Sequence, residues 1–523
     1  MTDVLPPARR VLVKPPVRHR GHYSLLPWLL SVTAVAAALP WLFRVPSHLV
    51  AFLLACQLIQ CAHGAMRAIM SGHRLLSAVF WTFCLCYIAV PAIYQVSTGQ
   101  AAWRDLYIYS NQERLLKTLI VTNVAFALYA LGSAGRPRGD SFPSARIRRD
   151  MVRFRSHSPR PIADQAPRQQ RSYLRPRAAS TVKAALSGTL VPLLYCGVAV
   201  LLLPLVIQAS GGIGGLFTSR TERSEALAAQ GIGQPQSGGA AVALVVILPG
   251  ALALAATYVL LLRWRTGHRT APFLITTASV LMFLYTNPFV NTRYISSVAL
   301  ISVLFLLVQP RTRKALGVVV VTLVIGVLGI YPLANAFRGS AAPTAEVSLA
   351  AEDFDGFQQM VNTMQFVEEH GHTWGAHLSS AVLFVVPRSV WPSKAEPASI
   401  PVAENRGYEF TNLSLPFPGE LYLEFGVFGV AAGMFLWGRG WRQLDEAWSA
   451  GTDSLAARMV PYFAIAQLGV LRGPVLSQYP IYASTTMLLL FALYLQPFRS
   501  RPGALPPTRG TATILHDDAA RVT

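Results

Sequence analysis

Apolar runs about as long as a lipid bilayer is thick recur along the whole chain. A transmembrane helix needs about 20 predominantly apolar residues, with a range of roughly 17 to 25. The chain is 53% hydrophobic and only 13% charged, whereas a soluble domain carries about 25% charged residues. The alternation of apolar and polar residues that a membrane β-barrel requires does not occur. These features predict an all-α, polytopic transmembrane helix bundle.

We expect about twelve of these runs to cross the membrane, each as one helix. The runs near 294–309 and 455–473 give the weakest signal, because they are short or carry polar residues. The other expected spans lie near 24–43, 47–66, 75–96, 114–133, 185–208, 239–262, 270–288, 314–333, 416–438 and 478–496.

The basic residues predict how these helices are oriented. The formal net charge is +21, and Lys and Arg in short loops mark the cytoplasmic side. With both termini inside, every strongly basic connector falls in the cytoplasm, so we expect a multi-pass protein of the cytoplasmic (inner) membrane. The expected sections are 1–135 (N-terminal tail and four spans), 136–184 (basic disordered cytoplasmic loop), 185–333 (spans five to nine), 334–415 (large, partly helical extracytoplasmic loop), 416–498 (spans ten to twelve) and 499–523 (cytoplasmic tail).

The basic section 136–184 is rich in Arg, Ser and Pro and has no apolar periodicity, a composition typical of disorder. Its charge would also suit nucleic acid, but no aromatic residues are interleaved with the arginines as nucleic-acid binding would favour. Attraction to anionic lipid headgroups is sufficient to explain it. We therefore expect membrane lipids, and no nucleic acid, among the partners.

Several arginines are expected at the outer ends of spans, where Arg is disfavoured. The guanidinium group is a planar fork of donors that matches phosphate oxygens, so a convergent set would suit a lipid-linked diphosphate. The alternative is that each arginine pairs with a loop carboxylate or reaches a lipid phosphate. The set is Arg293, Arg338, Arg388 and Arg472, with Arg220 and Arg223 in the first outer loop.

The large outer loop contains a helical pattern and a cluster of titratable residues. Apolar residues recur at a spacing of three and four from Phe354 to Val367, which predicts a helix lying on the membrane surface or packing across the bundle. Glu369, His370 and His372 follow and are candidate bases for a sugar hydroxyl, with a solvated loop as the alternative. The two histidines cannot share a helix face and lack a third ligand, so we expect no metal.

Two glutamates open the apolar run at 416–438. Glu420 and Glu424 are four residues apart and lie on one helical face. The helix dipole favours a carboxylate at a helix N-terminus, which suffices to explain Glu420. Glu424 lies one turn deeper in the apolar run, where a charge is costly. Glu420 is the candidate for a catalytic carboxylate.

The segment 352–440 resembles the Wzy-type O-antigen polymerases, a family of bacterial oligosaccharide repeat-unit polymerases. In that family an outer-loop helix precedes a P-R-x-x-W-P-x-K-P-like segment and a G-E-x-Y-x-x-F-G-x-x-G segment. The first is matched here by residues 387–397, including Arg388, Trp391 and Lys394, with Ala395 and Glu396 displacing the last proline. Residues 419–429 match the second, and NTRY at 291–294 resembles the family's Arg-bearing span.

The resemblance implies a membrane glycosyltransferase that joins undecaprenyl-diphosphate-linked repeat units into a surface polysaccharide at the outer face of the membrane. It implies no cofactor, polyprenyl-diphosphate-linked glycans as substrates, and a flippase and a chain-length regulator as partners. It adds Trp391 and Lys394 to the expected substrate-binding residues. Two alternatives stay open, an O-antigen-ligase-like transferase to another acceptor and a polysaccharide or lipid transporter.

Overall fold

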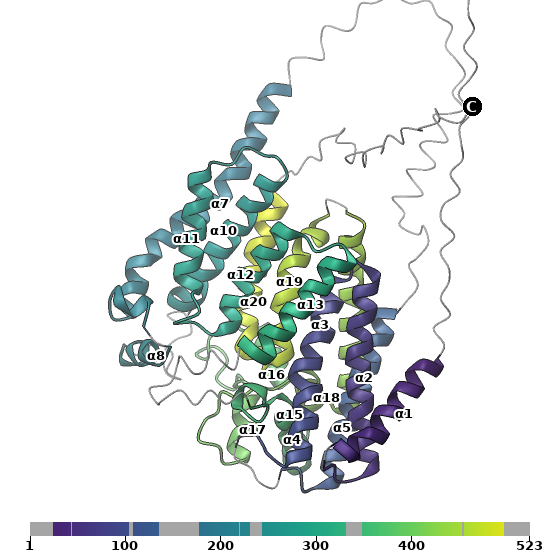
Figure 1. Ribbon diagram of the computed structural model, residues 1–523. Coiled ribbons are helices and arrows are strands. Elements are labelled where there is room, and N and C mark those ends of the chain that lie inside the picture. Colours follow the sequence, from purple (N-terminus) through teal and green to yellow (C-terminus); the bar gives the residue numbers. More distant parts are fainter. Residues whose placement is uncertain are drawn as a thin grey trace, which may run out of the picture.

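The computed structural model describes residues 25–42, 44–103, 108–134, 177–218, 220–230, 243–330, 348–451 and 454–495. Within these residues all regular secondary structure is helical, and no strand occurs. The predicted all-α class is therefore confirmed for this part of the chain. Figure 1 shows the long helices packed side by side as a bundle.

Among the described residues, seven helices are long and apolar enough to cross a membrane. Length and hydropathy thus make this a multi-pass membrane protein, and the prediction of a polytopic helical membrane protein is confirmed. The seven are α2 (His48–Ser71), α3 (Leu75–Cys84) continuing through a π-helical turn (Leu85–Ala89) into α4 (Val90–Thr98), α5 (Gln112–Ala134), α7 (Arg177–Ala209), α10 (Leu248–Arg265) with the π-helical turn Ala243–Ile247, α13 (Arg313–Ile325) with the π-helical turn Gly326–Ile330, and α18 (Phe417–Ser449).

Shorter or less apolar helices occupy the other predicted spans. They are α1 (Leu25–Leu42), α11 (Pro272–Thr286), α12 (Arg293–Val308), α19 (Leu455–Arg472) and α20 (Val475–Leu495). Every predicted span thus coincides with a helix. Seven of these helices in the described part of the chain are long and apolar enough to cross a membrane, whereas twelve crossings were predicted.

The continuous helix from α3 to α4 lies at the centre of the bundle. In its most apolar window 89% of the residues are buried inside the protein, against 11% for α13. Phe80 stacks on Tyr129 of α5 with ring centroids 3.5 Å apart, and Trp81 packs directly over Gly64 of α2. A helix that is apolar all round and exposed, such as α13, is suited to face lipid.

Helices α5 and α18 approach each other at their backbones through a pair of glycines. A Cβ built on Gly438 would lie 2.3 Å from the Tyr129 carbonyl oxygen, and one built on Gly132 would lie 2.2 Å from that of Phe435. Small residues permit this close approach between membrane helices. The contact holds α18 in a fixed register on α5.

Helix α18 reverses direction at Gly426, whose φ of 63° and ψ of −151° belong to a region essentially restricted to glycine. Beyond it the chain folds back on itself, since a Cβ built on Gly433 would lie 2.5 Å from Leu421 Cδ1. Two antiparallel arms result, 417–425 and 427–449, and the second is long enough to cross a bilayer at about 1.5 Å per residue. The prediction of one straight helix over 416–438 is wrong in this respect.

The predicted outer-loop helix is α15 (Gly356–His370), which follows a 3-10 turn (Glu352–Phe354). Its apolar face is fully buried at Phe357, Val361 and Met364. Polar residues of the same helix, such as Gln358 and Gln359, are buried as well. Two placements were predicted, on the membrane surface or packed across the bundle. The helix packs against the bundle, between α5, α18 and α17 (Ser399–Asn405).

The segments that surround α15 gather at one end of the bundle. Figure 1 places α15, α16 (Ala376–Val382) and α17 at its lower end, with α8 (Arg220–Ala229) at the same end. The segments between 209 and 238 and between 334 and 415 were predicted to share one side of the membrane. Their described helices do lie at one end.

Candidate functional site

A rigid turn before α12 is the point where three arginines from different elements meet. Asn287 accepts hydrogen bonds from the backbone N–H groups of Phe289 and Val290 and donates to the Leu216 carbonyl oxygen. Asn291 donates to the carbonyl oxygens of Tyr285 and Asn287. Both asparagines are buried, and satisfied buried amides fix the backbone around them. The turn therefore presents the start of α12 in a defined orientation.

Arg223, Arg293 and Arg472 form the arginine cluster around this turn. Arg223 of α8 is buried and donates from Nη1 to Asn291 Oδ1 at 3.2 Å. The guanidinium of Arg472, at the end of α19, lies over the Tyr294 ring at 4.9 Å from the centroid. Arg293 forms a salt bridge to Asp353 with an Nη1–Oδ2 distance of 3.4 Å. Positive charge from α8, α12 and α19 is thus concentrated beside one turn.

The acidic turn that begins α15 lies against this cluster. Asp355 is buried and accepts hydrogen bonds from Trp103 Nε1 at 3.0 Å and from the Ser414 backbone N–H at 3.2 Å. The Tyr87 hydroxyl lies 3.1 Å from its carboxylate, and Arg472 is close enough to Tyr87 to interact with it electrostatically. Asp353 and Asp355 therefore connect the arginine cluster to the centre of the bundle.

These acidic residues are the part of the site that the sequence analysis missed. The segment DFD at 353–355 was visible in the sequence. Residues two apart at a helix start point to different sides, so Asp353 can reach Arg293 while Asp355 reaches Trp103. The spacing was therefore a usable signal once a helix beginning at Gly356 was expected.

Arg388, Trp391 and Lys394 serve contacts within their own loop. Arg388 is half exposed and donates to the Lys394 carbonyl oxygen at 2.7 Å, with Glu396 at 3.9 Å. Lys394 Nζ donates to the carbonyl oxygens of Leu383, Phe384 and Val386, and burial, followed by the charge of Arg388, lowers its pKa. Trp391 Nε1 donates to Ser393. These contacts all lie between residues 383 and 396, so the three side chains stabilise their own loop.

Arg338 lies outside the described residues. Arg220 is the first residue of α8, and its side chain lies outside the described part of the structure. The structure therefore brings together Arg223, Arg293 and Arg472 of the predicted set.

Glu420 and Glu424 are both fully buried, in different surroundings. Glu424 accepts four hydrogen bonds, from the Thr373 hydroxyl and from the backbone N–H groups of Gly375, His377 and Leu378. It thereby satisfies the N-terminus of α16, as a carboxylate does at a helix start. Glu420 accepts one, from the Val475 backbone N–H at 2.7 Å, and its Oε1 has no hydrogen-bond partner among the described residues.

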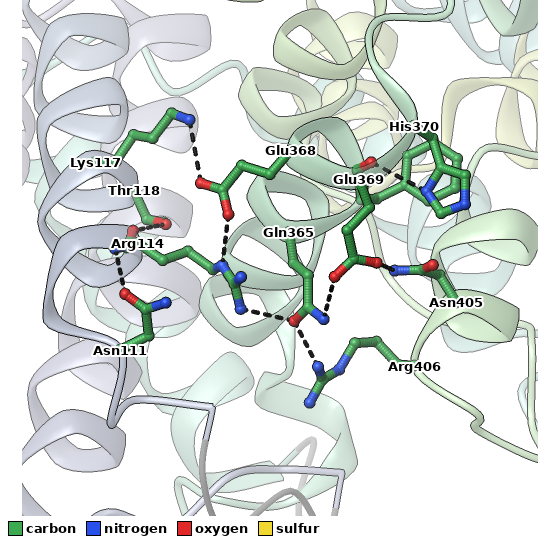
Figure 2. A network of polar contacts seen from close by, with 11 residues as sticks. Asn111, Arg114, Lys117, Thr118, Gln365, Glu368, Glu369, His370, Asn405 and Arg406 are labelled. Atoms are coloured by element: carbon green, nitrogen blue, oxygen red, sulfur yellow. Dashed lines mark hydrogen bonds and ion pairs between the residues drawn. The ribbon is translucent and has the colours of Figure 1, made fainter.

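Glu369 belongs to a polar network that ties α15 to α5 and α17 (Figure 2). Its oxygens accept from Asn405 Nδ2 at 2.9 Å and Gln365 Nε2 at 2.8 Å. These hydrogen bonds, from Asn405 first, lower the pKa of Glu369. Glu368 pairs with Arg114 at 3.0 Å and Lys117 at 3.2 Å. Glu369 is therefore a weaker base than an ordinary carboxylate.

The two predicted histidines differ in their environment. His370 is exposed and stacks on Phe366 at 4.6 Å. His372 lies against the reversal of α18, where a Cβ on Gly426 would meet its Nε2 at 3.0 Å, and it contacts the Trp374 and Tyr422 rings edge-on. Its buried Nδ1 has no hydrogen-bond partner among the described residues. His372 follows the end of α15 opposite Asp353, and the 15 residues of that helix span about 22 Å, so it lies away from the arginine cluster.

No family model matches the chain, and neither a curated protein nor a solved structure matches it. The fold and hydropathy define a polytopic helical membrane protein.

Proposed function

We propose that the protein is a membrane glycosyltransferase that joins undecaprenyl-diphosphate-linked oligosaccharide units into a surface polysaccharide. The observation that carries the proposal is the convergence of Arg223, Arg293 and Arg472 at the start of α12. Guanidinium groups are suited to bind phosphate oxygens in bidentate geometry. Arg293 also pairs with the loop carboxylate Asp353, and the convergence of guanidinium groups from three separate elements favours one shared anionic ligand.

The chemistry follows from this placement. The donor's anomeric carbon forms a bond to the acceptor's hydroxyl oxygen while its bond to the diphosphate oxygen breaks. The arginine cluster stabilises the negative charge that develops on the polyprenyl diphosphate as it leaves. The acceptor hydroxyl's proton passes to a carboxylate beside the cluster, for which Asp353 lies 3.4 Å from Arg293. Two lipid-bound substrates confined at one membrane face react at a reduced entropic cost.

The test uses Arg293→Lys and Arg472→Lys in a strain that lacks its own copy of the gene. Lysine keeps the charge but loses the planar fork, so we expect polymer to fall by about tenfold or more. Single repeat units should accumulate on the lipid carrier. The length profile of the surface glycan is compared with the membrane level of each variant.

Arg442→Lys is the matched control, because Arg442 is largely buried and pairs with Glu446 within its own helix at 2.7 Å. It should give a normal ladder. A normal ladder in both Arg293→Lys and Arg472→Lys would refute the proposed phosphate-binding role. If deletion of the gene removes all surface glycan, single repeat units included, the protein is a ligase instead.

A further inference from the structure

An aromatic pair lies beside the arginine cluster and has no role in the chemistry above. Trp103 and Phe410 stack with ring centroids 5.4 Å apart and planes inclined by 16°, and Tyr408 lies 6.2 Å from Trp103. Trp103 comes from the segment that follows α4, and Phe410 from the segment before α18. Two connectors distant in the sequence therefore build one aromatic surface.

Trp103 is held rigidly by α15. Gln358 accepts from the Trp103 backbone N–H and donates to its carbonyl oxygen, both at 2.9 Å. Asp355 accepts from the indole N–H. The same Gln358 amide donates to the Tyr408 hydroxyl at 3.0 Å. A platform fixed in this way loses little conformational entropy when a ligand lies on it.

Phe410 leaves half of its surface exposed, 50%, although it lies in a polar segment. Its neighbours Glu409 and Asn412 are also exposed. A ring that faces lipid has apolar surroundings, as Phe428 does next to the exposed Val427 on α18. An aromatic ring flanked by a carboxylate and an amide suits a ligand that has an apolar face and hydroxyl groups at its edge.

The distance to the arginine cluster is short. Asp355 binds Trp103 and Asp353 binds Arg293, and two residues of chain span at most about 7 Å. Because the two carboxylates point to different sides of the chain, a glycan carried by a diphosphate at the arginine cluster would reach the aromatic pair with sugars beyond the first.

We propose that Phe410, stacked on Trp103 as its support, forms a saccharide platform that binds a sugar ring of the lipid-linked substrate through its C–H face. This inference rests on the proposed function for the identity of the sugar's carrier. It adds a recognition site for the glycan itself, separate from the site for the diphosphate.

The experiment measures binding of lipid-free oligosaccharides to the full-length protein in lipid nanodiscs. The probe is a size-fractionated partial hydrolysate of the surface polysaccharide made by the producing strain, and binding is followed by calorimetry and saturation-transfer NMR. Phe410→Leu should weaken binding about tenfold, because it removes the stacking ring. Phe410→Tyr should restore it. Phe428→Leu, at an 88% exposed position on α18, should bind as the wild type does.

Trp103→Phe supplies a second test, since it keeps a ring but removes the indole N–H that donates a hydrogen bond to Asp355. It should weaken binding less than Trp103→Leu. The thermal unfolding of each variant in the same nanodiscs shows whether it is folded.

Equal binding by folded Phe410→Leu and wild type would overturn the platform and would assign the ring to the lipid headgroup region. Absence of oligosaccharide binding by a wild-type protein that still makes polymer would overturn the platform and leave the proposed function intact. Phe410-dependent binding together with normal polymer in the arginine variants would support the platform and refute the diphosphate site.

Discussion

The ring of Phe417 packs against the indole of Trp437, with the ring centroids 4.7 Å apart. In a straight helix these residues would lie about 30 Å from each other, at about 1.5 Å per residue. The contact is therefore a direct consequence of the reversal at Gly426. The short arm 417–425 carries both buried glutamates, so the reversal decides where those carboxylates lie.

Gly426→Ala should destabilise the protein by about 1–3 kcal/mol, because the residue has a backbone conformation that L-residues rarely adopt. The added Cβ would also lie 3.0 Å from the His372 ring. Thermal and denaturant unfolding of the detergent-solubilised protein measures the loss. Gly440→Ala is the control on the same helix, since nothing lies within 4 Å of its Cβ. It should be neutral or stabilising by up to about 1 kcal/mol; equal effects of the two changes would contradict the reversal.

Glu424→Gln should destabilise more than Glu420→Gln. Each oxygen of Glu424 accepts two hydrogen bonds, and an amide nitrogen in place of either would leave two buried donors unsatisfied, at a cost of about 1–3 kcal/mol per group. Glu420 accepts one hydrogen bond, which the Gln oxygen can keep.

Unfolding curves of the two variants, recorded beside the surface-glycan ladder, separate stability from activity. A stable Glu420→Gln protein with a collapsed ladder would assign a chemical role to that carboxylate. If Glu424→Gln unfolds like the wild type, the interpretation of Glu424 as the carboxylate that caps α16 is wrong.

The positions of the helices could be predicted from the sequence because length and hydropathy act locally along the chain. The same signal concealed the reversal of α18, since PFPGELYLEFGVFGVAAGMFLWG reads as one continuous apolar run. Gly426 lies within the motif at 419–429, but a single glycine in a helical pattern does not by itself indicate a reversal. The close approach of Gly433 to Leu421 is a tertiary contact that hydropathy does not encode.

The sequence predicted that arginines form the site, but it predicted only some of the residues that lie there. Arg293 and Arg472 were expected at the outer ends of spans, and they meet. Arg388 was expected among them from its place at the outer end of a span, yet its hydrogen bond is to Lys394 in its own loop. The buried polar side of α15, with Gln358 and Asp355, could not be foreseen because its partners lie in connectors distant in the sequence.

Arg388→Lys should leave the glycan ladder close to that of the wild type. Arg388 is half exposed and its hydrogen bond goes to a carbonyl oxygen, an acceptor that a lysine can also reach. Arg472→Lys in the same strain provides the contrast, because Arg472 lies over Tyr294 within the arginine cluster. A ladder that collapses in Arg388→Lys but persists in Arg472→Lys would move the phosphate site to the 387–397 loop.

Acid should weaken the contact between α15 and α17. Asn405 and Gln365 lower the pKa of Glu369 below its usual value of 4.5. A carboxyl whose pKa is lower in the folded state contributes stability above its unfolded pKa, and this contribution is lost as the pH falls through the folded value. The effect should be small because Glu369 is exposed to solvent. Melting temperatures at pH 7 and near pH 3 should differ less in Glu369→Gln than in wild type; an unchanged difference would contradict the assignment.

Labelling of single cysteines should place α17 outside and the connector between α10 and α11 in the cytoplasm. All five native cysteines are buried and free, so the background reaction with a membrane-impermeant maleimide should be low. Glu404 on α17 and Thr266 after α10 are both exposed. Glu404→Cys should react in intact spheroplasts, whereas Thr266→Cys should react only after permeabilisation, because the basic segment 263–269 favours the cytoplasm. Reaction of both from the same side would refute the predicted orientation, and with it the placement of the arginine cluster at the outer face.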